Sequence, residues 1–321
     1  MTELFLGTPV WMWSVFMTLV VLLLALDLGV LNKGDKEISA KRSLTIYTFY
    51  IAMAVAFGGW IWMEKGPESA MTYYTGYVIE QSLSMDNLFV MALIFGYFAI
   101  PRAYQHRVLF WGILGVIVLR GVMIGVGAAL VAEFHWLLYL FSAFLIYSGI
   151  KMFSADHDNM DIEHNPILQF LRKHVRVSNR LHGHQFFIKE PDGKGKIVTA
   201  FTPLMVALIL IECADVIFAV DSVPAIFALT TDTYIIYTSN IFAILGLRTL
   251  YFALSAMMAR FEYLKYALAA VLVFIGSKIF LNDFVFDGDK FPPSISLSVT
   301  FGLLSTGVIY SLWRTRNQSA K

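Results

Sequence analysis

The sequence contains a single cysteine among its 321 residues, Cys213, which rules out an internal disulfide and a cysteine-rich metal site. Charge is scarce as well: Asp, Glu, Lys and Arg make up 15% of the chain, and the formal net charge is +1. This balance gives no indication of binding to nucleic acid or another acidic polymer. No cleavable signal peptide is evident, because the first apolar run, 10–31, is long enough to span a bilayer and is followed by basic residues.

Apolar residues dominate what is present. They make up 58% of the chain, aromatic residues make up 15%, and the mean hydropathy is +0.68, far above that of a soluble domain. Apolar segments of spanning length lie at 10–31, 43–63, 70–99, 107–130, 134–153, 200–229, 234–258, 263–281 and 294–313. The sequence therefore predicts an all-α, polytopic transmembrane helical bundle of about nine helices.

The basic residues of the connecting segments predict its orientation. Lys and Arg gather in 32–42, 101–107, 154–199 and 259–265 and in the C-terminal tail, whereas the alternate connections hold only Lys65 and Lys290. Because cytoplasmic loops carry the excess of Lys and Arg, we expect the N-terminus outside and the C-terminus in the cytoplasm.

The two halves of the chain resemble each other. Residues 133–153 align without gaps onto 260–280, with eight identities, among them Gly149 with Gly276 and Lys151 with Lys278. Spans three to five therefore match spans six to eight, and the predicted orientation makes the repeat inverted, an architecture typical of secondary transporters. The expected divisions are two N-terminal helices (1–69), a first repeat (70–153), a cytoplasmic linker (154–199), a second repeat (200–281) and a C-terminal helix with its tail (282–321).

Acidic residues stand inside these apolar spans. The spacing of Glu80, Asp86 and Asn87 in the third span recurs as Asp215, Asp221 and Ser222 in the sixth, which also carries Glu212. A carboxylate at the bilayer centre costs about 3 kcal/mol on insertion scales. These seven residues are therefore the predicted cation site: Glu80, Asp86, Asn87, Glu212, Asp215, Asp221 and Ser222.

Two arginines within the spans, Arg120 and Arg248, are the predicted charge-balancing partners. We expect Arg248 to neutralise Asp215 or Asp221 when no metal is bound. Asp27 and Asn240 are further candidates for the cluster. Carboxylate, amide and hydroxyl oxygens suit Mg²⁺, Ca²⁺ or Mn²⁺ better than Zn²⁺ or Cu⁺.

Two local features complete the sequence-based predictions. Pro224 cannot donate to the carbonyl of Val220, so we expect the sixth span to kink or unwind there. The linker 154–199 holds five of the seven histidines and a basic amphipathic piece, 167–180. It is predicted to be a solvated linker with a surface helix; the alternative is a metal-sensing patch of His157, Asp158, Asp161, Glu163 and His164.

The two acidic motifs, EQSLSMDNLFV at 80–90 and DVIFAVDSVPAIFA at 215–228, resemble those of the TerC integral membrane proteins, most closely the Alx type. The resemblance covers nearly the whole chain. It implies a multi-pass protein of the bacterial inner membrane, in a family linked to manganese export, tellurite resistance and redox modulation.

The resulting hypothesis is an exporter of a divalent cation, Mn²⁺ by the resemblance, with Ca²⁺ or Mg²⁺ as alternatives and protons as a counter-ion. No permanently bound cofactor and no enzymatic activity are expected, since the membrane spans offer acids but no nucleophile–histidine pair. The alternatives are a redox modulator, for which the chain shows no haem, flavin or iron–sulfur signature, and a tellurite-resistance protein, whose anion the acids would repel.

Overall fold

The structure of the chain is a computed structural model that describes residues 4–27, 40–154, 165–178, 180–191, 197–254, 263–284 and 291–318. The helices are α1 (Val10–Leu26), α2 (Ala40–Lys65), α3 (Pro67–Tyr97), α4 (Arg102–Glu133), α5 (Leu137–Ser154), α6 (Pro166–His174), α7 (Pro203–Phe227), α8 (Thr233–Leu245), α9 (Leu247–Leu254), α10 (Leu264–Phe284) and α11 (Pro293–Gln318). Two antiparallel hairpins join β1 (Leu4–Phe5) to β2 (Thr8–Pro9) and β3 (Phe187–Pro191) to β4 (Ile197–Phe201).

The helices confirm the predicted all-α polytopic membrane fold. Within the described residues, seven are long and apolar enough to cross a membrane, with α8 and α9 counted as one span. The apolar helices α1 and α5 are shorter than the other spans. Each of the nine predicted apolar segments therefore coincides with one helix or, for the seventh, with α8 and α9 together.

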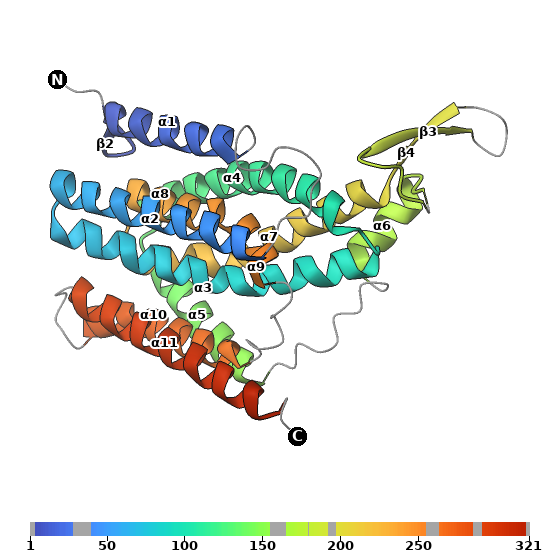
Figure 1. The fold of residues 1–321 in the computed structure, drawn as a ribbon. Helices are drawn as coiled ribbons and strands as arrows, with labels where there is room; N and C mark the ends of the chain where they lie inside the picture. The colour runs from blue at the N-terminus through green and yellow to red at the C-terminus, as the bar shows by residue number, and fades with distance from the viewer. Residues whose placement is uncertain are drawn as a thin grey trace.

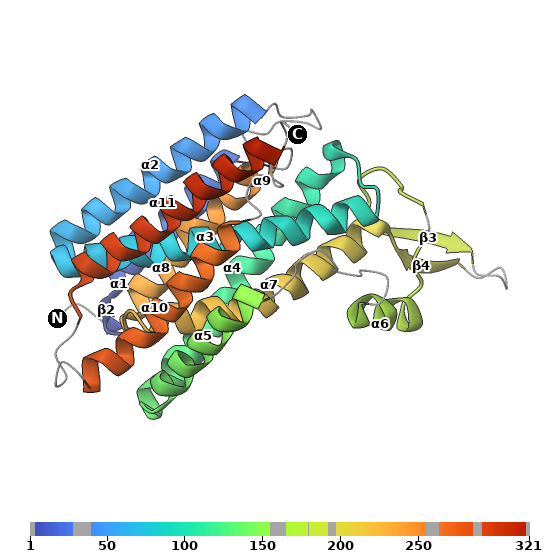
Figure 2. The same cartoon turned by 90° about the horizontal axis from the view of Figure 1, so that it is seen from below.

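The spans lie along a common direction, so the molecule is longer parallel to the helices than across them (Figure 1). The N-terminus lies at one end of this bundle. The helix α6 and the hairpin β3–β4 project from the other end, toward which the C-terminal end of α11 also points (Figures 1 and 2). An odd number of spans places the termini on opposite sides in this way.

The span formed by α8 and α9 is the centre of the bundle. Of its spanning window, 94% is buried, whereas the corresponding share for α4 and α11 is 22%. Gly246 joins the two helices with helical angles, and an added Cβ there would lie 3.1 Å from the ring of Tyr47 on α2. Polar side chains on this span are therefore shielded from lipid on all sides.

The helices α5 and α10 pack through reciprocal glycines. A Cβ on Gly149 would lie 2.8 Å from the carbonyl oxygen of Ala269, and one on Gly276 would lie 2.7 Å from that of Ser142. In the alignment of the two halves, position 149 matches 276 and position 142 matches 269. Such an exchange of contacts is what a two-fold relation between the halves requires. The inverted repeat itself stays a prediction.

Two local expectations differ from the structure. The helix α7 runs without interruption from Pro203 through Pro224 and ends three residues later, at Phe227. The predicted unwinding is therefore absent, although Pro224 leaves the carbonyl of Val220 without the amide donor of an ordinary helical residue.

The linker holds more structure than was predicted. The surface helix is confirmed but ends at His174, and Asn165 caps it by accepting from the amides of Ile167 and Leu168. The hairpin β3–β4 was not predicted, because its strands are short and lie among polar residues. The five residues of the alternative metal-sensing patch lie outside the described residues.

Candidate functional site

A buried guanidinium stands at the centre of the bundle. Arg120, in the middle of α4, is 1% exposed and donates hydrogen bonds to side chains of α3, α7 and α8. Its Nη1 donates to Glu80, to Ser222 Oγ at 3.0 Å and to Asn240 Oδ1 at 2.8 Å. Its Nε and Nη2 donate to the two carboxylate oxygens of Asp215 at 3.4 and 3.3 Å.

The charges of this Arg120 cluster do not cancel. Glu80 and Asp215 are 1% and 2% exposed, so two carboxylates share one guanidinium with almost no access to solvent. When both are ionised, the net charge of the three groups is −1. A buried ion pair compensates the cost of desolvation only when its geometry is good and its remaining polar atoms are satisfied. Ser222 and Asn240 supply part of that satisfaction.

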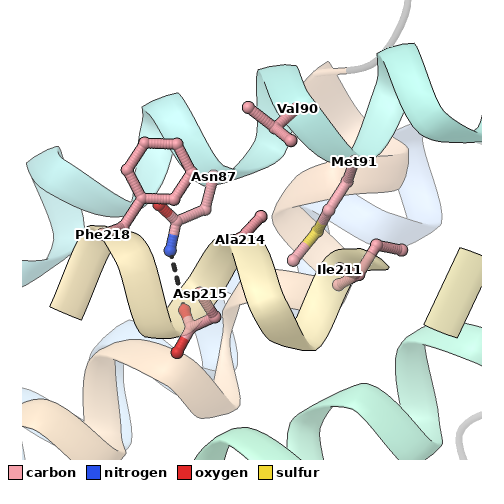
Figure 3. A pocket seen from close by; sticks show the side chains of 7 residues that line it. All are labelled: Asn87, Val90, Met91, Ile211, Ala214, Asp215 and Phe218. Carbon is pink, nitrogen blue, oxygen red and sulfur yellow. Dashed lines mark hydrogen bonds between the residues drawn. The ribbon is translucent and has the colours of Figure 1, made fainter. Parts of the chain in front are cut away.

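A second polar contact joins α3 to α7 beside the cluster. Asn87 Nδ2 donates to Asp215 Oδ1 at 2.9 Å (Figure 3). Asp215 therefore receives hydrogen bonds from α3 and from α4 at once. Because α3 and α4 belong to the first half of the chain and α7 to the second, Asp215 connects the two halves.

Glu212 lies apart from these bonds. Both of its carboxylate oxygens are buried and have no hydrogen-bond partner among the described residues. They rest against α4, where a Cβ on Gly115 would lie 2.4 Å from Oε1. The glycine is what allows the carboxylate to fit between the helices. The role of Gly115 was not predicted, although two glycines one turn apart in α4, Gly112 and Gly115, indicate that another helix packs closely there.

Arg248 has a different partner from the expected one. It is 3% exposed on α9, and its Nη2 donates to Oδ1 of Asp27, at the end of α1, at 2.9 Å and forms an ion pair with Oδ2 at the same distance. Of the two acids expected to pair with Arg248, Asp215 is instead paired with Arg120, and the side chain of Asp221 lies outside the described residues. The sequence matched the two arginines by position, whereas the structure gives one to the central cluster and the other to the contact between α1 and α9.

The predicted site residues thus separate into groups. The structure brings together Glu80, Asn87, Arg120, Asp215 and Ser222, and adds Asn240. Glu212 and Arg248 lie outside this cluster. The side chains of Asp86 and Asp221 lie outside the described residues. Among the side chains that are described, no three of His, Cys, Asp and Glu are grouped closely enough to hold a metal ion.

The comparisons with known proteins agree with this architecture. The family described as "Integral membrane protein TerC family" matches residues 65–319. An uncharacterised membrane protein of Myxococcus xanthus is 44% identical over 97% of this chain and 94% of its own length. Proteins named "Putative membrane-bound redox modulator Alx" are 41% identical in Salmonella typhi, over 98% of each chain, and 42% identical in Escherichia coli, over 96% and 95%.

No solved structure matches the chain. The family match covers most of the residues, and the relatives align over nearly their whole lengths. The family match spans both acidic motifs and the positions of the Arg120 cluster. The chain is therefore a multi-pass integral membrane protein of the TerC family.

Proposed function

We propose that the protein exports a divalent cation, with Mn²⁺ as the main substrate, across the bacterial inner membrane. The observation that supports this proposal is that the buried carboxylates of Glu80 and Asp215 already bind a cationic group, the guanidinium of Arg120. A site that holds one cation by oxygen atoms alone has the chemistry to hold another. The N-terminus is proposed to lie outside and the C-terminus in the cytoplasm.

The ligand chemistry supports a hard cation. Around Arg120 the acceptors are two carboxylates, a hydroxyl and an amide carbonyl, with no histidine and no thiol among them. Oxygen sets of this kind suit Mn²⁺, Mg²⁺ and Ca²⁺. Asp86 and Asp221, each six residues further along α3 and α7 than Glu80 and Asp215, are proposed as additional ligands from their matched spacing.

Arg120 is proposed to alternate with the metal. While the guanidinium lies between Glu80 and Asp215, those oxygens are occupied, and a metal ion has to displace it. The displaced arginine returns when the ion leaves, so an empty site never buries two bare carboxylates. Protons taken up by the same carboxylates are proposed to move in the opposite direction.

A flux measurement tests the proposal. Purified protein in liposomes that contain a Mn²⁺-sensitive dye should carry Mn²⁺ down its gradient, and Asp215→Asn should abolish the flux. Flux of Ca²⁺ or Mg²⁺ with no response to Mn²⁺ would change the substrate. The absence of flux of all three would reject transport of a divalent cation.

The relatives named as redox modulators suggest a second candidate function. In this chain the only thiol is that of Cys213, which is partly buried next to Glu212. A redox role carried by that thiol predicts that Cys213→Ser loses the function. Cation transport predicts that Cys213→Ser protein still moves Mn²⁺, so one variant separates the two candidates.

A further inference from the structure

A narrow crevice leads to the Arg120 cluster between α3 and α7. It is lined by Asn87, Val90, Met91, Ile211, Ala214, Asp215 and Phe218. Its polar lining is Asn87 and Asp215, the pair joined by the hydrogen bond in Figure 3; the other walls are apolar. The crevice is too narrow to hold a water molecule in this conformation.

Oxygen atoms without partners line the adjoining face of α3. Glu80 Oε2, Ser84 Oγ and Asn87 Oδ1 are buried and accept no hydrogen bond from any described residue. Their spacing of four and three residues places them on one face of the helix, about 6 and 4.5 Å apart along its axis. Buried polar atoms are nearly always satisfied, so a row of three unpaired oxygens indicates a ligand that comes and goes, such as a cation or its water.

The same face of α3 continues to Met91, four residues beyond Asn87. Its side chain extends from α3 toward α7, where Ile211 lies on the opposite wall (Figure 3). Beyond them lies an apolar layer that includes Ile94, Phe95 and Leu204. In both helices this direction leads away from the Arg120 cluster toward the end of the bundle that carries α6, the predicted cytoplasmic end (Figure 1).

We propose that the α3–α7 crevice is the path by which the cation reaches the Arg120 cluster from the cytoplasmic side, with Met91 and Ile211 as its closed gate. The inference rests on the proposed function for the identity of the ion. Ser84 and Asn87 supply neutral oxygens that replace part of the hydration shell on the way in. Asn87 then delivers the ion to Asp215, which it already contacts. The structure is that of the closed path, with Arg120 in the place of the ion.

A steric test uses the gate itself. Met91→Trp enlarges a side chain that faces the opposite wall of the crevice, and it should lower the rate of Mn²⁺ export at least tenfold. Mn²⁺ binding at equilibrium in detergent should stay within about twofold of the wild type, because the substitution removes none of the oxygen ligands. Phe89→Trp is the matched control: it lies two residues away on α3, is 39% exposed and is absent from the crevice lining. Equal export by Met91→Trp and wild-type protein, or equal loss in the control, would overturn the proposal.

A labelling test keeps the proposal open to refutation if Met91→Trp does not fold. In a Cys213→Ser background, Met91→Cys should react with a charged, membrane-impermeant thiol reagent in inside-out vesicles and not in right-side-out vesicles. Phe89→Cys should react in neither. Reaction from the outside only, or no reaction in a protein that transports Mn²⁺, would refute the path. If the wild-type chain moves no Mn²⁺, the proposed function fails, and labelling from the inside still establishes the crevice as an entrance.

Discussion

Removal of the charge of Arg120 tests whether guanidinium and metal compete for the same oxygens. In Arg120→Gln, Glu80 and Asp215 lose their shared cation and the three hydrogen bonds that it donates to them, and Ser222 and Asn240 lose one each. Breaking a buried ion pair from one side costs about 3–5 kcal/mol, because the remaining charge is uncompensated. The metal-free variant should therefore be less stable than the wild type by this order.

The free energy of pairing between Arg120 and the carboxylates also opposes metal binding, so removing the arginine should strengthen binding. In the wild type, Mn²⁺ must displace the guanidinium; in Arg120→Gln it meets two uncompensated carboxylates. If about 3 kcal/mol of the pairing is no longer lost on binding, the Kd for Mn²⁺ should fall by about a hundredfold. Export should slow, because nothing replaces the ion when it leaves.

Calorimetric titration of detergent-purified protein gives the Kd, and flux in liposomes gives the rate. Arg248→Gln is the matched control, since it removes an equally buried guanidinium whose partner is Asp27. It should destabilise the fold without changing the Kd. Weaker Mn²⁺ binding by well-folded Arg120→Gln protein would refute the competition. Identical behaviour of the two variants would mean that the ion pair of Arg120 stabilises the fold and does not compete with the metal.

Three shorter predictions address the site, its packing and the topology. Asp215→Asn should insert normally, as judged by its level in purified membranes, yet bind Mn²⁺ at least tenfold more weakly in titration, because it removes the carboxylate that faces both Arg120 and the crevice. Gly115→Ala should lower the thermal midpoint by several degrees in detergent, since its Cβ would lie 2.4 Å from a buried carboxylate oxygen, whereas Gly125→Ala, with nothing within 4 Å, should not. In intact cells, a cysteine at His174 should resist a membrane-impermeant thiol reagent and one at His135 should react; the reverse pattern would invert the protein.

The helices were predictable because the bilayer imposes a simple rule. A segment that crosses it needs about 20 apolar residues and must satisfy its own backbone, and each such run in the sequence became a helix. The ends of the helices were less predictable: α1 stops at Leu26, and α3 begins at Pro67, before its apolar run. A proline at the first helical position sets the start of α3, and hydropathy does not register it.

The charged residues of the site were predictable, because charge within a membrane span is rare, but the ion pairs that they form were not. Any acid or arginine within a span needs a partner, which correctly marked Glu80, Asp215 and Arg120. The choice of partner depends on which helix faces which, and the sequence gives only the order of helices. The match of Arg248 to Arg120 by repeat position predicted a pairing with Asp215 or Asp221, whereas the structure pairs Arg248 with Asp27 and Asp215 with Arg120.

The resulting cluster is single and shared between the halves of the chain. Glu80 and Arg120 come from the first half, and Asp215, Ser222 and Asn240 come from the second. Two symmetric half-sites, one per repeat, could fill and empty independently. A shared cluster cannot, because hydrogen bonds from Arg120 to Asp215, Ser222 and Asn240 cross between the halves, beside the bond from Asn87 to Asp215. On the proposed function, a metal that displaces the guanidinium breaks every bond that Arg120 makes across the halves, so binding of the ion is coupled to movement of one half against the other.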